Sequence, residues 1–261
     1  MADDVLLQLN NVTKSFGGLT AVSDVTMEVR HGQIVSIIGP NGAGKTTVFN
    51  LITGIYKPTT GDILLEGRSI TGLTPDRVLR RGITRTFQNI RLFNNMTVME
   101  NVLVGLHTKL PNDLASVLLH LPHYQRAEKA ARARAAELLG FFGPEMVELQ
   151  EENASNLSYA FRRRLEICRA LGSSPKMLLL DEPTAGMNDK ETETAIAYIR
   201  QLRDELGITI LLIEHKLQVT MGISDHIVVL DYGEKIAEGP PAEVQTNERV
   251  IEAYLGRKAA V

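Results

Sequence analysis

The sequence is poor in the residues that hold together proteins of oxidising compartments. It contains one cysteine, Cys168, and no tryptophan. A single cysteine excludes an internal disulfide and argues against a metal site built from cysteines. We therefore expect a protein of a reducing compartment.

The sequence also lacks a hydrophobic run long enough to cross a bilayer. The longest apolar runs, such as ITILLI at 208–213, fall far short of the ~18 residues that spanning requires. The N-terminal residues MADDVLLQLN contain no basic region followed by an apolar stretch, as a secretory signal would. We expect a chain that is neither secreted nor inserted in a membrane by itself and that is soluble when isolated.

A strong charge of either sign is missing as well. The formal net charge is −3, so the chain has no overall positive field that would attract nucleic acid. We expect no nucleic-acid partner. Basic residues gather only locally, within residues 77–81 and 162–164. We interpret both clusters as solvated helix faces.

What the sequence does have is a series of short apolar runs, in a chain of 261 residues with 44% hydrophobic content. That is enough for one large domain or two closely packed subdomains. The later runs alternate with helical patterns such as 189–206, which predicts a parallel sheet with crossover helices. Residues 88–170 have mainly helical spacing and predict a helical insertion. Strands are predicted at 6–9, 25–30, 33–38, 63–66, 83–87, 177–180, 208–213, 226–230 and 235–237.

The strongest local signal is IVSIIGPNGAGKTT at 34–47, which has the GxxxxGK[ST] spacing of a phosphate-binding loop between an apolar strand and a helix start. Glycines let the backbone wrap closely around phosphate oxygens, and the helix N-terminus adds partial positive charge. Lys45 would neutralise the β and γ oxygens of a nucleotide, and the Thr46 hydroxyl would bind Mg²⁺. The predicted nucleotide-binding residues here are Gly39, Pro40, Asn41, Gly42, Ala43, Gly44, Lys45, Thr46 and Thr47.

Two acidic residues follow a second apolar strand, in KMLLLDEPTAG at 176–186. Ligands of open α/β sheets bind at the carboxyl ends of strands. Asp181 would hold Mg²⁺ through water, and Glu182 would polarise the attacking water as a general base or orient it. Adjacent acids after a strand are common in loops, but the phosphate-binding loop upstream favours the functional interpretation.

Three other residues are ambiguous when taken alone. His215 follows a strand in ILLIEHK, where a histidine is more often structural than catalytic, although it could reach a γ-phosphate. Gln88 in RTFQNIRLF has the character of an ordinary polar loop residue. Phe16 in KSFGG lies near the N-terminus, where an aromatic residue usually belongs to a core.

Taken together and in this order, these residues resemble the nucleotide-binding subunit of ABC transporters over essentially the whole chain. The resemblance makes Glu182, His215 and Gln88 catalytic and adds Gln88 to Thr46 and Asp181 as Mg²⁺ ligands, the last through water. The matching segments are an adenine platform at Phe16, Walker A at 39–46, a glutamine loop at Gln88, a signature at 157–161, Walker B at 177–182, a D-loop at 185–188 and a switch histidine at His215.

The resemblance also implies a fold and its divisions. The fold would be α/β, a P-loop NTPase (RecA-like) core with an N-terminal antiparallel β subdomain and an inserted α-helical subdomain. A single nucleotide-binding domain would cover residues 1–261. Its parts would be the ATPase core with the β subdomain at 1–87 and 171–240, the helical subdomain with the signature at 88–170, and a C-terminal helical extension at 241–261.

A narrower resemblance, to the LivG-type subunits of branched-chain amino acid importers, is carried by residues 85–105, 211–239 and 250–256. It implies a subunit that uses ATP and Mg²⁺ to energise uptake of branched-chain or related hydrophobic amino acids. The implied partners are two integral-membrane permease subunits, a second ABC ATPase subunit that is a paralogue or a second copy, and, indirectly, an extracytoplasmic solute-binding protein. The implied location is the cytoplasmic face of the inner membrane, where the chain would be peripheral.

Two other function classes compete with import. A soluble ABC-type ATPase could act as a mechanical clamp outside transport, although a single cassette without a long coiled coil does not favour it. A small-molecule kinase could use the same phosphate-binding loop, but its activity would not explain Gln88 or the segment LSYAF at these positions.

The signature departs from the usual LSGGQ pattern. Ser158 is kept and Tyr159 is compatible with LivG-type relatives, whereas Ala160 replaces the second glycine and Phe161 replaces a polar residue. In the family, the signature residues Ser158, Tyr159 and Ala160 would face the ATP held by a partner subunit. A Cβ there takes up space, and phenylalanine removes a polar contact. We hypothesise that this signature completes the partner's ATP site poorly, the alternative being that Ser158 and the helix dipole supply most of the interaction.

Overall fold

The computed structural model describes residues 4–107 and 122–255. The parts of the predicted helical subdomain and C-terminal extension that fall at 108–121 and 256–261 lie outside the described residues. The chain forms two compact units. The first joins residues 1–85 with 176–261, and the second comprises residues 86–175.

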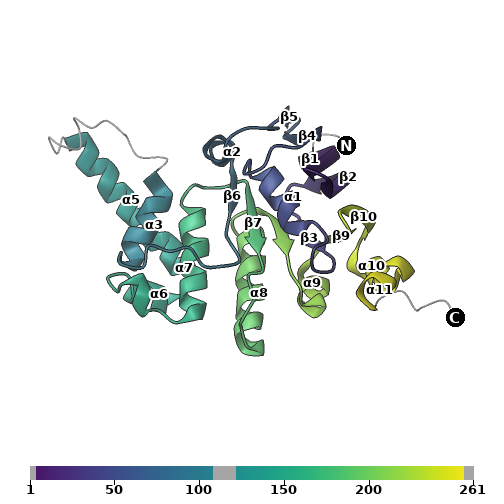
Figure 1. The fold of residues 1–261 in the computed structure, drawn as a ribbon. Coiled ribbons are helices and arrows are strands. Elements are labelled where there is room, and N and C mark those ends of the chain that lie inside the picture. The colour runs from purple at the N-terminus through teal and green to yellow at the C-terminus, as the bar shows by residue number, and fades with distance from the viewer. Residues whose placement is uncertain (1–3, 108–121, 256–261) are drawn as a thin grey trace. The chain divides into compact units, whose positions relative to one another are not determined.

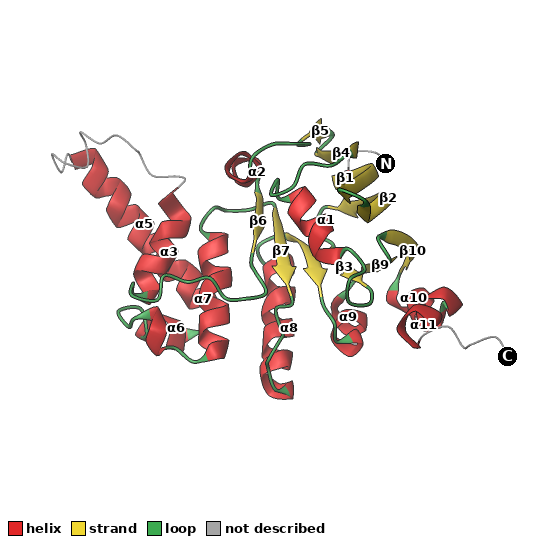
Figure 2. Cartoon of the chain, viewed as in Figure 1, coloured by secondary structure: helices red, strands yellow, loops and turns green. Residues whose placement is uncertain are grey.

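The first unit is built on a six-stranded sheet with the order β10-β9-β3-β8-β7-β6. Figure 2 shows the strands in yellow and labels all of these except β8. Five strands are parallel, and only the edge strand β10 is antiparallel to its neighbour. Every residue of β3, β7 and β8 is buried, as expected for parallel strands covered on both faces. The strands are β3 (Ile34–Ile38), β6 (Ile83–Arg85), β7 (Met177–Asp181), β8 (Thr209–Ile213), β9 (His226–Asp231) and β10 (Glu234–Gly239).

Helices connect these strands and continue beyond the last of them. The longest, α8, begins with a capping box in which Asn188 and Glu191 bond each other's backbone N–H. It ends at Asp204, two residues before the predicted end. The helices of this unit are α1 (Lys45–Ile52), α2 (Pro75–Arg81), α8 (Asp189–Asp204), α9 (Leu217–Ile223), α10 (Pro241–Thr246) and α11 (Glu248–Leu255).

A second sheet in this unit is antiparallel and has the order β2-β1-β4-β5. Its first two strands, β1 (Val5–Phe16) and β2 (Leu19–Arg30), are much longer than the predicted 6–9 and 25–30. They pair along their whole length as a hairpin, so polar residues that break the apolar pattern still find ladder partners. The other strands are β4 (Thr60–Leu65) and β5 (Arg68–Ser69). Apolar residues of β1, β2, β3, β7, β8 and α1 share one core.

The second unit is helical among its described residues (Figure 1). Its helices α3 and α7 pack so closely that a Cβ on Gly105 would lie 2.0 Å from the carbonyl oxygen of Arg169. A glycine is therefore required at that crossing. The elements are α3 (Val98–Leu106), α5 (Pro122–Phe141), α6 (Pro144–Glu148), a 3₁₀ turn (Ala154–Asn156) and α7 (Tyr159–Leu171). No helix in the described ranges of the chain is both long and apolar enough to cross a membrane.

Candidate active site

Three loops of the first unit leave the same edge of its parallel sheet. The phosphate-binding loop follows β3, Asp181 ends β7, and His215 lies two residues beyond β8. The register aligns these ends, because Ile213 pairs with Ile37 on one side and with Asp181 on the other. The topology thus brings the predicted loop, acids and histidine to one place, as expected for a ligand site of an open α/β sheet.

The phosphate-binding loop has a backbone that only glycine permits at two positions. A Cβ on Gly39 would lie 2.0 Å from the carbonyl oxygen of Leu230, and one on Gly44 would lie 2.5 Å from that of Ala21. Gly42 has a φ of +82° and open space where a Cβ would be. The loop is therefore packed tightly on its inner side and uncovered at Gly42, a shape that lets a phosphate approach the backbone.

Lys45 supplies the cation of this loop. Its ammonium donates to the carbonyl oxygens of Gly39 at 2.6 Å and Pro40 at 2.9 Å. Burial lowers the pKa of Lys45, while the charges of Glu182 and Asp181 act in the opposite direction. A buried ammonium is costly, so it is stabilised strongly by an added anion. Lys45 is also the first residue of α1, and a helix N-terminus favours a bound phosphate. The loop therefore fits a nucleotide phosphate.

Asp181 has a partner that the sequence did not suggest. Arg85, the last residue of β6, donates to its carboxylate at 2.6 Å, and both side chains are buried. The same guanidinium donates to the amide oxygen of Asn50 at 2.5 Å and lies over the ring of Phe49, with 5.3 Å between its central carbon and the ring centroid. Arg85 thus fixes the orientation of one Asp181 carboxylate oxygen.

The oxygen donors of this edge suit a hard cation. Thr46 offers a hydroxyl and Asp181 a carboxylate, the ligand types that Mg²⁺ prefers. Across the described parts of the chain, no cluster of three or more histidine, cysteine, aspartate or glutamate residues could hold a metal ion. In sites that use nucleotides, Mg²⁺ is commonly held by one or two side chains together with substrate phosphates, so such an ion would be bound here together with a nucleotide.

Glu182 and His215 form a direct pair. The imidazole Nε2 lies 2.7 Å from a carboxylate oxygen of Glu182, whose side chain is 15% exposed. The backbone of Glu182 has a φ of +49°, a left-handed conformation that is unfavourable for a residue with a Cβ. Its N–H donates to the carbonyl of Ile213 at 2.9 Å, which holds the turn in place. Such locally strained backbone is concentrated at functional sites.

Glu214 is a further residue of this site that sequence reasoning missed. Its buried carboxylate accepts from the Thr184 N–H at 3.0 Å, from the Thr184 hydroxyl at 2.6 Å and from the His215 N–H at 3.1 Å. One carboxylate therefore ties the turn that carries Glu182 to the turn that carries His215. The only sequence signal was its place between a buried strand and the histidine.

Phe16 does not belong to the core, since 42% of it is exposed. Its ring meets that of Tyr56 edge to face, with centroids 5.1 Å apart, and the Lys14 ammonium lies 4.9 Å from its centroid. The interpretation of Phe16 as an ordinary core residue is wrong, because the end of the β1–β2 hairpin extends beyond the packed part of the sheet. An exposed aromatic ring is available for stacking against a base.

The second unit carries Gln88 and the signature residues. Ser158 caps α7, with its hydroxyl accepting from the Phe161 N–H at 3.5 Å. Ser158 and Tyr159 are exposed, whereas Ala160 is partly covered. The interpretation of residues 162–164 as a solvated face is wrong, because Arg163 is only 1% exposed and its two neighbours are partly buried. The first unit's basic cluster at 77–81 does lie on the exposed side of α2.

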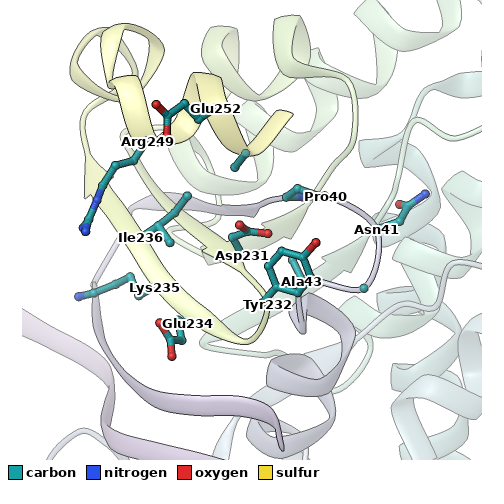
Figure 3. Close-up of a pocket in the computed structure, with 12 residues that line it drawn as sticks. Pro40, Asn41, Ala43, Asp231, Tyr232, Glu234, Lys235, Ile236, Arg249 and Glu252 are labelled. Carbon is teal, nitrogen blue, oxygen red and sulfur yellow. The ribbon is translucent and has the colours of Figure 1, made fainter. Parts of the chain in front are cut away.

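A cavity of about 790 Å³ borders the phosphate-binding loop and the C-terminal helices (Figure 3). Its lining includes Asn41 and Ala43 from the loop, Tyr232 from the β9–β10 turn and Arg249 from α11. Next to it, the Tyr254 side chain of α11 packs against the apolar cluster that contains Ile38, and burial raises the pKa of Tyr254. The described part of the C-terminal extension thus braces the outer side of the loop.

Known proteins resemble this chain over nearly its full length. The ABC transporter family matches residues 22–185, and a family described as "Branched-chain amino acid ATP-binding cassette transporter" matches residues 234–260. The high-affinity branched-chain amino acid transport ATP-binding protein LivG of Salmonella typhimurium is 49% identical over 96% of this chain and 98% of its own. BraF of Pseudomonas aeruginosa, described in the same words, is 46% identical over the same shares.

Solved structures agree with these sequence relatives. The ADP conformation of MJ1267, an ATP-binding cassette of an ABC transporter, is 33% identical, covers 97% of this chain and 99% of its own, and has a TM-score of 0.82. The bacterial ABC transporter cassette MJ0796, whose structure is dimeric, is 28% identical over 90% of this chain and 99% of its own, with a TM-score of 0.76. These similarities confirm the predicted α/β P-loop NTPase fold, and the chain belongs to the ABC transporter family, as an ATP-hydrolysing ATP-binding subunit of the LivG type.

Proposed function

We propose that this chain binds and hydrolyses ATP to energise the import of branched-chain amino acids through membrane permease partners. The observation that carries the chemistry is the convergence of Lys45, Asp181 and the Glu182–His215 pair at one sheet edge. The cargo is supported by the names of the relatives that match nearly the whole chain. A clamp outside transport is not favoured, because those relatives are transport proteins.

Each residue of the sheet edge has a part in the proposed reaction. Lys45 and the N-terminus of α1 hold the phosphates and offset their charge. Glu182 orients and polarises the attacking water, and His215 fixes the Glu182 carboxylate by the 2.7 Å contact. Thr46 and Asp181 would hold Mg²⁺, the latter through water, and Gln88 would complete this set. When bound, Mg²⁺ offsets charge on the phosphate oxygens.

We also propose the assembly in which the chain works. Two cassettes would bind ATP head to tail, so that Ser158, Tyr159 and Ala160 of each face the nucleotide of the other. Phe16 would stack on the adenine. The second cassette is a paralogue or a second copy, and two permeases anchor the pair at the cytoplasmic face of the inner membrane. A solute-binding protein delivers cargo from the other side. The dimeric state of the similar cassette MJ0796 supports the pairing.

Purification from detergent-solubilised membranes tests this assembly. The full chain carrying an affinity tag, expressed with its neighbouring genes, is expected to retain two multi-spanning membrane proteins and one further cassette. If the tagged chain is recovered without these proteins, although the membranes contain them, the proposal is contradicted.

The altered signature leads to a prediction about rate. Replacing Ala160 with glycine and Phe161 with glutamine together is expected to raise the ATPase rate of the assembled transporter, because a Cβ is removed and a polar contact is restored. Phe161 is half-buried, with Arg164 over its ring at 5.0 Å. Steady-state phosphate release measures the change. An unchanged rate together with an unchanged nucleotide affinity would mean that Ser158 and the helix dipole already suffice.

A further inference from the structure

Arg163 is a buried charge in the second turn of α7, in a run of arginines that normally indicates a solvated face. Only 1% of Arg163 is exposed, and only 1% of Glu166, the residue three positions later on the same helix. Their side chains form a salt bridge at 2.8 Å. A buried charge is tolerated only when it is paired and hydrogen-bonded, so the environment of this pair must supply further partners.

The further partners come from the segment that contains Gln88. The guanidinium of Arg163 donates to the carbonyl oxygens of Phe87 at 2.7 Å and Gln88 at 2.9 Å. Glu166 completes the network by accepting from the Arg91 N–H at 3.2 Å. The pair therefore forms hydrogen bonds with backbone atoms of three residues in the five-residue loop 87–91.

The same guanidinium also reaches the signature. Its second terminal nitrogen lies 3.4 Å from the hydroxyl of Tyr159, the third signature residue. A planar guanidinium presents several donors in a fixed fork, which suits bonds to two successive carbonyls and a carboxylate at once, whereas a lysine ammonium is a single point charge. Arg163 is thus a direct physical link between the glutamine loop and the first turn of the signature helix.

Neighbouring arginines make contacts within the loop and just beyond it. Arg162 donates to the amide oxygen of Asn94 at 2.9 Å, and Arg91 lies over the ring of Phe87 at 4.2 Å. Replacing a buried ion pair with apolar residues of similar volume is often neutral for stability. A pair of this kind is therefore better explained by the geometry it fixes than by the stability it adds.

We propose that Arg163 and Glu166 are positioning residues that make the Gln88 loop and the start of the signature helix move as one body. A displacement of the Gln88 backbone would then shift Tyr159 and Ser158 with it, so that the state of one ATP site is transmitted to the signature that serves the other. Neither residue touches nucleotide. This inference rests on the proposed roles of Gln88 and the signature.

The conservative variant Arg163→Lys provides the test, because it keeps the charge and loses the fork. In the complete transporter, it is expected to lower the ATPase kcat at least tenfold and to bring the Hill coefficient for ATP close to one. The ATP affinity of the purified chain and its melting temperature should stay near those of the unaltered chain. The matched control is Arg134→Lys, which alters an exposed Arg134–Glu137 pair with the same spacing and the same 2.8 Å distance.

Hydrogen exchange supplies a readout that a merely structural role would not change. In the unaltered complex, ATP is expected to alter exchange at 87–91 and 158–163 together, and in Arg163→Lys the two segments should respond separately. Joint responses in Arg163→Lys with unchanged kcat would overturn the proposal, as would a parallel loss of ATP affinity, melting temperature and kcat. If Arg163→Lys does not fold, Glu166→Gln is judged by the same criteria, with Glu137→Gln as its control. An inactive unaltered complex would instead contradict the proposed function.

Discussion

Replacing Glu182 with glutamine is expected to lower the ATP turnover number of the assembled transporter by about 100- to 10,000-fold, the usual contribution of general acid–base catalysis. Glu182 follows Asp181 at the end of β7, and its carboxylate is held by His215 at 2.7 Å. An amide has nearly the same shape but cannot accept the proton of the attacking water. The phosphate-binding loop is untouched, so ATP binding is expected to persist.

Two assays on the same variant separate these effects. Steady-state phosphate release from the complex measures turnover, and binding of a fluorescent ATP analogue to the purified chain measures affinity. Glu205→Gln is the matched control, since Glu205 is an exposed residue at the C-terminal cap of α8. Near-normal hydrolysis by the Glu182→Gln complex would show that Glu182 is not the residue that activates water.

Lys45→Met should have its largest effect on nucleotide binding. Truncating one partner of a buried charge pair costs about 2–5 kcal/mol, which corresponds to an increase of roughly 30- to 5,000-fold in the Kd for ATP. Lys45 is 6% exposed, and burial lowers its pKa, so an anionic phosphate in the loop is expected to stabilise its charge strongly. Methionine keeps the length of the side chain and removes the charge.

Isothermal calorimetry of the purified chain with ATP and Mg²⁺ measures this effect. Lys176→Met serves as the control, because the Lys176–Glu66 pair is exposed to solvent. Thermal unfolding of both variants is needed as well, since the Lys45 ammonium also bonds the carbonyls of Gly39 and Pro40. An unchanged Kd in a folded Lys45→Met variant would exclude Lys45 from phosphate binding.

Local sequence was sufficient to predict that Lys45, Asp181 and His215 lie together at one edge of the sheet. Each follows a short apolar strand, and the carboxyl ends of parallel strands meet at one edge. The register around Ile213 aligns the ends of β3, β7 and β8. The left-handed backbone of Glu182 was not predictable, because nothing in the sequence DEPT indicates a positive φ.

The residues that support the site escaped prediction because their partners are distant in sequence. Arg85 and Asp181 are separated by 96 positions, and Arg163 lies 75 positions from Gln88. A helical run of arginines is usually solvated, so the burial of Arg163 could be recognised only once the loop that covers it was known. Hydrophobic periodicity likewise predicted β1 and β2 to be shorter than they are. Paired strands tolerate polar residues that interrupt the apolar pattern.

The most direct test of the proposed function is uptake of radiolabelled leucine into proteoliposomes that contain the complete transporter, with ATP trapped inside and the solute-binding protein outside. The proposal predicts that leucine accumulates only when ATP and Mg²⁺ are inside, and that accumulation is lost when this chain carries Glu182→Gln. Leucine uptake that proceeds equally without ATP, or with the Glu182→Gln chain, would contradict it.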